Sequence, residues 1–232
     1  MSKLQVICIG EALIDQIINQ SDSNSKNYLG GAPANVACAL RKLQVPTAFI
    51  GCLGDDDFGR EFIKLFQKLN INIDFLQITK QFSTRIVKVV IDESGDRAFS
   101  GFQITKSNTF ADERLDKFVL NKNIKNLKKQ FLNTKYIVTG TNLLSSSKSA
   151  DSLNFILDYA RNFRIKVIID INWREIFWNT SIVSTSSQFK KVKNFLHRAD
   201  ILKLASEEAN LFFDTIDPSK ISKLLTNQPD VI

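Results

Sequence analysis

The segment "YLGGAPANVACAL" (residues 28–40) places two glycines and a proline directly before a helix-like apolar pattern. Gly30 and Gly31 allow the backbone to approach a ligand closely, and Pro33 suits the first turn of a helix. In a parallel α/β sheet, ligands bind beyond the carboxyl ends of the strands, where loops lead into helix N-termini. The segment therefore indicates either a plain turn or a binding site for a polyhydroxylated or anionic small molecule, with Asn35 donating and accepting hydrogen bonds.

On both sides of this segment, apolar patterns of strand and helix type alternate along the chain. Short apolar runs predict strands at residues 5–10, 46–54, 135–140, 166–171 and 200–204. Helical spacing predicts helices at residues 32–43, 57–70, 111–131, 148–163, 187–197 and 206–213. This alternation is typical of the α/β class, with a doubly wound, mostly parallel sheet covered by helices on both faces.

Two segments do not fit the alternation. Residues 83–102 are rich in β-branched side chains around "DESGD", a turn-like centre, and therefore predict a hairpin. Residues 13–20 predict a further short strand pair beside it. We expect these segments to form a small β insertion over one edge of a single domain that spans residues 1–232.

The last sixteen residues predict a short helix, a turn and then the opening of another buried strand at Val231 and Ile232. Because that strand is begun and not continued, we expect the domain to be incomplete at its C-terminal end.

Composition excludes several function classes. The net charge is +7, but the lysines are scattered, and the densest run has apolar residues at helical spacing, so nucleic acid is not an expected partner. No run approaches the roughly 18 consecutive apolar residues that a membrane span requires. The N-terminus shows no signal-peptide pattern, and we therefore expect a cytoplasmic protein.

A carboxylate follows the first predicted strand in "GEALID" (residues 10–15). At that place Asp15 could accept hydrogen bonds from two hydroxyl groups of a sugar, or it could be a solvated turn acid. The segment "GCLGDDDFG" (residues 51–59) matches neither the P-loop nor the dinucleotide fingerprint. Its three aspartates, residues 55–57, are therefore interpreted as turn and helix-cap residues.

Several motifs in order resemble those of the ribokinase-like, or PfkB, carbohydrate kinases, and within them the fructokinases. The motifs are "GE-x-L-x-D" at 10–15, "GGAPANVACALRKL" at 30–43, "FIGCLGDDDFG" at 49–59, "DINWREIFW" at 170–178 and "ILKLASEEA" at 201–209. The resemblance covers residues 5 to about 213 and implies a ribokinase-like fold with a small β lid.

Carried over by position, the resemblance implies phosphorylation of a sugar by ATP with Mg²⁺, and it assigns candidate roles. The implied sugar-binding residues are Asp15, Gly30, Gly31, Asn35, Phe99 and Asn172, with Phe102 as a further candidate for the apolar face of the sugar. Arg174 would support phosphate transfer beside Asn172, and Glu208 would bind Mg²⁺ through water. Segments 13–29 and 83–102 would form the lid, through which a homodimer could assemble. Arg174 could instead pair with Glu175, and Phe99 could belong to the core.

The family's catalytic aspartate, within a Gly-Ala-Gly-Asp loop, has no match in residues 1–232. We therefore expect the base to lie beyond residue 232, and two functions stay open. One is a fructokinase-like sugar kinase of which this chain is an amino-terminal portion. The other is a catalytically silent sugar-binding or regulatory pseudokinase. The motifs favour fructose without fixing the sugar, because the same scaffold serves different substrates.

Overall fold

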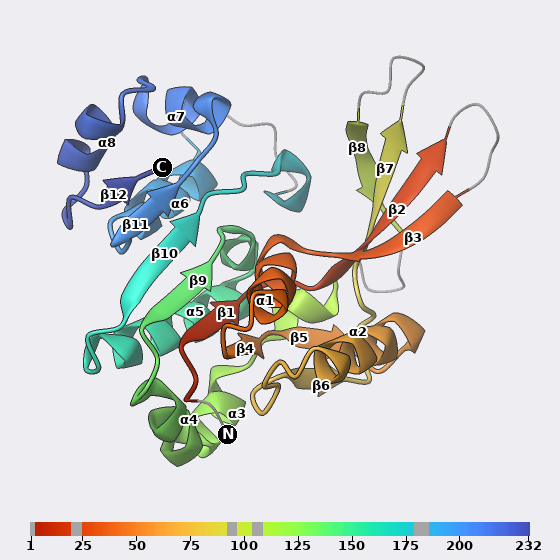
Figure 1. The fold of residues 1–232 in the computed structure, drawn as a ribbon. Coiled ribbons are helices and arrows are strands. Elements are labelled where there is room, and N and C mark those ends of the chain that lie inside the picture. Colours follow the sequence, from red (N-terminus) through yellow and green to blue (C-terminus); the bar gives the residue numbers. More distant parts are fainter. Residues whose placement is uncertain (1–2, 20–24, 92–96, 104–108, 179–185) are drawn as a thin grey trace.

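The computed structural model describes residues 3–19, 25–91, 97–103, 109–178 and 186–232 (Figure 1). Its main sheet has six strands in the order β12-β11-β10-β9-β1-β4, and every neighbouring pair is parallel. These strands are β1 (Val6–Ile9), β4 (Thr47–Ile50), β9 (Tyr136–Thr139), β10 (Lys166–Asp170), β11 (Ile201–Lys203) and β12 (Asp230–Val231). The order of strands confirms the predicted doubly wound, parallel α/β sheet.

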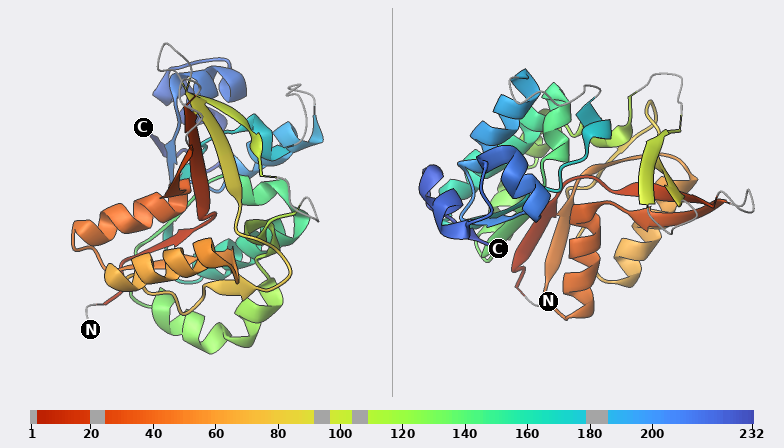
Figure 2. Two further views of the ribbon diagram at one scale, coloured as in Figure 1. Left: turned by 90° about the vertical axis from the view of Figure 1, so that its right-hand side faces the viewer. Right: turned by 90° about the horizontal axis from the view of Figure 1, so that it is seen from above.

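Helices cover both faces of this sheet (Figure 2). The helices are α1 (Ala32–Lys42), α2 (Asp57–Lys68), α3 (Lys117–Lys122), α4 (Ile124–Phe131), α5 (Ser147–Arg161), α6 (Ser187–Leu196), α7 (Ser206–Phe213) and α8 (Pro218–Leu224). Side chains of β1 alternate between two hydrophobic cores: Val6 and Cys8 pack with α1 and α2, whereas Ile7 and Ile9 pack with α3 to α7. This alternation explains why each strand reads as an almost continuous apolar run.

A second sheet projects from the main body, on the right of Figure 1, and we call it the outer sheet. Its strand order is β3-β2-β7-β8, with β2 (Leu13–Asn19), β3 (Ser25–Gly30), β7 (Ile86–Ile91) and β8 (Arg97–Phe102). β2 with β3 and β7 with β8 are antiparallel pairs, while β2 and β7 pair in parallel. The predicted β insertion is confirmed for these strands, and the predicted turn at 92–96 lies outside the described residues.

A buried ion pair fastens the outer sheet to the main body. Arg85, immediately before β7, donates from Nε and Nη2 to both carboxylate oxygens of Asp112, at 2.8 and 3.0 Å. Its guanidinium also lies 4.3–4.7 Å from the ring centres of Phe102, Phe110 and Phe177. Cation–π contacts of this kind are strongest where water is excluded. The entry to β7 is therefore held in a fixed position.

Two predicted elements are broken in the structure. The expected strand at 46–54 divides at Gly51 into β4 and β5 (Cys52–Gly54), and β5 pairs with an unpredicted strand, β6 (Gln77–Thr79). The expected helix at 111–131 becomes a 3₁₀ turn (Ala111–Arg114) followed by α3 and α4. Asp116 caps α3 by accepting from the Phe118 N–H, which starts a new helix inside a sequence with continuous helical spacing.

The predicted final strand exists as β12, which pairs with β11. It was expected to be buried, but Val231 is half-buried and Ile232 is 70% exposed. Among the described residues, no helix combines the length and the apolar content needed to cross a membrane.

Candidate functional site

A cavity of about 170 Å³ lies where the outer sheet meets the carboxyl ends of the main-sheet strands. It is lined by five of the residues singled out from the sequence: Asp15, Gly31, Asn35, Asn172 and Arg174. These residues come from three places, namely β2, the start of α1 and the loop after β10. The fold thus brings the predicted sugar-binding residues near α1 and the predicted residues of the loop after β10 together around one cavity.

The two glycines at the mouth of α1 are required by close contacts. Gly31 has φ +97°, and a Cβ there would lie 2.5 Å from the main-chain oxygen of Glu11. A Cβ on Gly30 would overlap the carboxylate of Asp15, because Asp15 and Gly30 lie close together on the paired strands β2 and β3. Gly30 therefore does not line the cavity itself, but it leaves the space that the Asp15 carboxylate occupies.

The loop after β10 forms the opposite wall. Asn172 adopts the left-handed conformation, with φ 41°, which turns the chain directly after the strand. The indole rings of Trp173 and Trp178 stack with centres 4.9 Å apart and hold the loop against the core. Arg174 is half-buried and donates from Nη1 to the main-chain oxygen of Trp173 at 2.8 Å.

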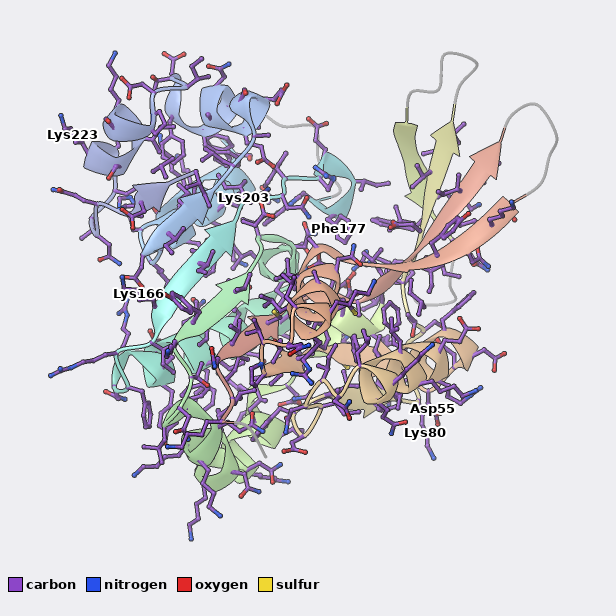
Figure 3. All side chains as sticks on the ribbon, viewed as in Figure 1. Asp55, Lys80, Lys166, Phe177, Lys203 and Lys223 are labelled. Carbon is purple, nitrogen blue, oxygen red and sulfur yellow. The ribbon has the colours of Figure 1, made fainter. Side chains whose placement is uncertain are left out.

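Six residues that line the cavity were given no role from the sequence: the apolar Leu13, Ala32 and Val87, and three with polar or aromatic side chains. Glu11 and Asn142 are buried, and Phe177 lies at the base of the outer sheet, where Figure 3 labels it. Glu11 stands in a quoted motif directly after β1, and Asn142 follows β9, the neighbour of β1 in the sheet. The rule that parallel strands gather their carboxyl ends at one edge could have identified both positions.

Glu11 has the most strongly shifted pKa of the carboxylic acids among the described residues. Burial raises its pKa from 4.5 to about 7 and outweighs the lowering effect of its hydrogen bonds. The lowering effect comes from the nearby backbone N–H groups of Glu11 and of Ala32, at the start of α1, and from Asn142 Nδ2, which donates to Glu11 Oε1 at 3.0 Å. The nearby charge of Asp112 raises the pKa of Glu11 further.

The remaining candidates lie elsewhere or outside the described part. Phe99 belongs to β8, but its side chain is not among those described, so its contact with a ligand stays a prediction. Phe102 does not line the cavity; its ring packs against Phe110 and Phe177, with centres 5.5 and 5.3 Å apart. The structure gives Phe102 a packing role at the base of the outer sheet, and its contact with a ligand stays a prediction.

Glu208 lies at the start of α7, beside the wall formed by the loop after β10. Its Oε1 accepts from the Trp173 N–H at 2.6 Å, and its Oε2 accepts from the Ala205 N–H at 2.8 Å. Each carboxylate oxygen keeps a second lone pair, so the arrangement fits a Mg²⁺ ion held through water. The described residues contain no group of three or more metal-ligating side chains that would bind a metal directly.

Comparison with known proteins gives consistent matches. The family profile described as pfkB family carbohydrate kinase matches residues 3–229. Probable fructokinase-5 of Arabidopsis thaliana is 30% identical over 209 residues, which are 88% of this chain and 60% of that protein. The chain therefore spans about 60% of the length of the first curated relatives that it matches.

Solved structures agree with the observed fold. The fructokinase of Halothermothrix orenii is 25% identical with a TM-score of 0.74, and the match covers 97% of this chain and 76% of that one. A double mutant of the Vibrio cholerae O395 fructokinase, in a form with fructose, ADP and potassium ion bound, is 25% identical with a TM-score of 0.75. That match covers 92% of this chain and 64% of the other.

Proposed function

This chain belongs to the pfkB family of carbohydrate kinases, and from that membership we propose that its cavity binds a sugar, with fructose as the first candidate, for phosphorylation by ATP. The observation that carries this proposal is the shared lining of one cavity by Asp15, Gly31 and Asn35 on one side and by Asn172 and Arg174 on the other. The similarity to fructokinases, one of them solved with fructose, supports the choice of sugar.

The sugar-binding side would act through short polar groups in fixed positions. The Asp15 carboxylate accepts hydrogen bonds from sugar hydroxyls, and charge-assisted bonds of this kind are roughly twice as strong as neutral ones. Asn35, on the first turn of α1, both donates and accepts. Gly31 contributes backbone to the cavity wall in a conformation, with φ +97°, that suits glycine.

The opposite wall would face the phosphate groups. The guanidinium of Arg174 offers positive charge there, and Asn172 offers an amide donor. Glu208 would hold Mg²⁺ through water, and the ion would supply neutralisation of the phosphate charge when bound. Most of the catalysis of phosphoryl transfer is positioning and charge stabilisation, which such groups provide. The outer sheet, as the predicted lid, would exclude water from the cavity.

We further propose that residues 1–232 bind sugar without transferring phosphate, because no Gly-Ala-Gly-Asp segment occurs in them. A base and a cradle of backbone N–H groups each contribute about 10²–10³ or more in rate. Sugar binding without turnover is also the property that a regulatory pseudokinase would have. A cytoplasmic location, the absence of a nucleic-acid partner and a homodimer through the outer sheet stay predictions.

Isothermal titration calorimetry with fructose, run beside an ATP-coupled kinase assay, tests both parts. We expect binding by the wild-type chain, loss of binding in Asp15→Asn and retained binding in the control Asp55→Asn, an exposed aspartate paired with Arg60. Absence of binding to fructose and to other sugars by the folded wild-type chain would overturn the sugar proposal. Turnover by this chain alone would contradict the expected position of the base.

A further inference from the structure

The floor of the cavity contains a pair of buried polar side chains with incomplete hydrogen bonding. Glu11 is 2% exposed and Asn142 is 6% exposed, and the two are joined by one bond from Asn142 Nδ2 to Glu11 Oε1. The second oxygen of the carboxylate, Glu11 Oε2, and the amide oxygen, Asn142 Oδ1, are buried with no hydrogen-bond partner in the described structure. Both residues line the same cavity as Asp15 and Asn35.

Two neighbouring acceptors without donors are costly for a protein. A buried acceptor left unsatisfied costs about 1–3 kcal/mol, and more when it carries charge. The cost disappears when a molecule in the cavity donates hydrogen bonds to both oxygens. The amide oxygen of Asn142 can only accept, and so can the Glu11 carboxylate once it is ionised, above its pKa of about 7. The matching group must then carry a hydrogen: a hydroxyl satisfies both oxygens, whereas an ether oxygen, a methoxy group or a phosphate oxygen does not.

We infer that Glu11 and Asn142 form a second recognition point for the substrate, which accepts a hydrogen bond from a free hydroxyl group at the floor of the cavity. The inference rests on the proposed function and deepens it, since it defines one end of the sugar. That end carries an unmodified hydroxyl, and a phosphate is repelled there by the Glu11 carboxylate. Sites that bind a substrate hydroxyl through buried polar groups reject the analogue without it far more strongly than apolar pockets reject a missing methylene.

The test is a calorimetric scan of fructose against its monodeoxy and mono-O-methyl derivatives at about pH 8, where the Glu11 carboxylate is ionised. For the wild-type chain, we expect one hydroxyl position of the sugar at which both deoxygenation and methylation weaken binding by about 10- to 100-fold. We expect this loss to depend on Glu11 and Asn142. In Glu11→Gln and in Asn142→Ala, the discrimination at that position should fall to a small factor, while discrimination at other positions persists. Glu207→Gln, an exposed acid of α7 outside the cavity, is the control and should behave as wild type.

Each outcome decides the matter. If the affinity of each derivative relative to fructose is the same in the wild type and in the folded Glu11→Gln variant, the inference is wrong even though the sugar proposal stands. If no single-position change weakens wild-type binding by more than a few-fold, the inference is wrong without recourse to any variant. If the wild type binds no sugar at all, the proposed function fails, and the inference that rests on it fails with it; the wild-type fructose titration alone separates this case from the other two.

Discussion

Two buried polar clusters in this molecule differ in how completely their hydrogen bonds are made. Around Arg85, both oxygens of Asp112 accept from the guanidinium, and Glu113 accepts a further bond at 2.5 Å. Between Glu11 and Asn142, one bond is made and two acceptors stay open. We call the first the closed cluster and the second the open cluster. The difference indicates that buried polar groups have two roles here: the closed cluster stabilises the scaffold, and the open cluster is arranged for a ligand.

The two clusters are connected through Phe177. Its ring lies 4.7 Å from the Arg85 guanidinium, and the same residue lines the cavity. Phe102, at the end of β8, packs against this ring with centres 5.3 Å apart and also contacts the Arg85 guanidinium. The closed cluster therefore fixes the wall against which a ligand of the open cluster would lie.

The largest effect is expected from breaking the closed cluster. Arg85→Met leaves the buried carboxylate of Asp112 and the half-buried carboxylate of Glu113 without a counter-charge and should lower the free energy of unfolding by about 3–5 kcal/mol. Urea unfolding measures the change. Arg60→Met, which removes an exposed arginine from its pairs with Asp55 and Asp57, should leave the midpoint unchanged. Equal stability of Arg85→Met and wild type would mean that the cluster does not stabilise the scaffold.

Glu11, in the open cluster, should make the free energy of unfolding depend on pH. Burial raises the pKa of Glu11 from 4.5 to about 7, with a smaller contribution from the charge of Asp112. Between these values the folded chain holds the Glu11 proton while the unfolded chain has released it, so stability falls as the pH rises. Glu11→Gln should remove this fall, which amounts to at most about 3 kcal/mol.

The measurement is the change in the free energy of unfolding between about pH 5 and about pH 8, taken for the wild type and for Glu11→Gln. We expect a distinctly smaller decrease in the variant. Parallel pH profiles for the two proteins would show that Glu11 is ionised normally in the folded state.

A third polar site, closed but only half-buried, should show the smallest effect of the three. Asp56 caps α2: Oδ1 accepts from the Gly59 N–H at 2.8 Å, and Oδ2 accepts from the Thr84 N–H at 2.7 Å. Asp56→Ala should cost about 1–2 kcal/mol. The matched change Asp57→Ala, at a side chain 93% exposed, should cost much less. If thermal unfolding shows equal losses for both, the cap contributes nothing specific.

Most of the fold followed from periodicity, because strands buried on both faces and helices with one apolar stripe leave distinct patterns. Periodicity failed where a local bond interrupts a continuous pattern, as the Asp116 cap does inside the expected helix 111–131. It also missed β6, a three-residue strand with too few residues to show a pattern.

The candidate site likewise contains residues that local sequence patterns could identify and residues that they could not. Asp15, Gly31 and Asn35 could be identified because they stand in or beside a glycine segment that leads into a helix. Glu11 and Asn142 could not be paired from the sequence, since their contact depends on β1 and β9 being neighbours in the sheet. Neighbour relations of strands are set by the whole chain rather than by any local stretch.

Fructose titrations of the wild type, Gly30→Ala and Gly140→Ala test the central claim, that a hydroxyl-rich ligand is bound where Asp15 meets the mouth of α1. A methyl group at Gly30 would overlap the Asp15 carboxylate, whereas one at Gly140 has its nearest neighbour at 3.4 Å, the main-chain oxygen of Asp170. The account predicts that Gly30→Ala folds and loses binding while Gly140→Ala binds as the wild type does. Wild-type affinity in a folded Gly30→Ala protein would contradict it.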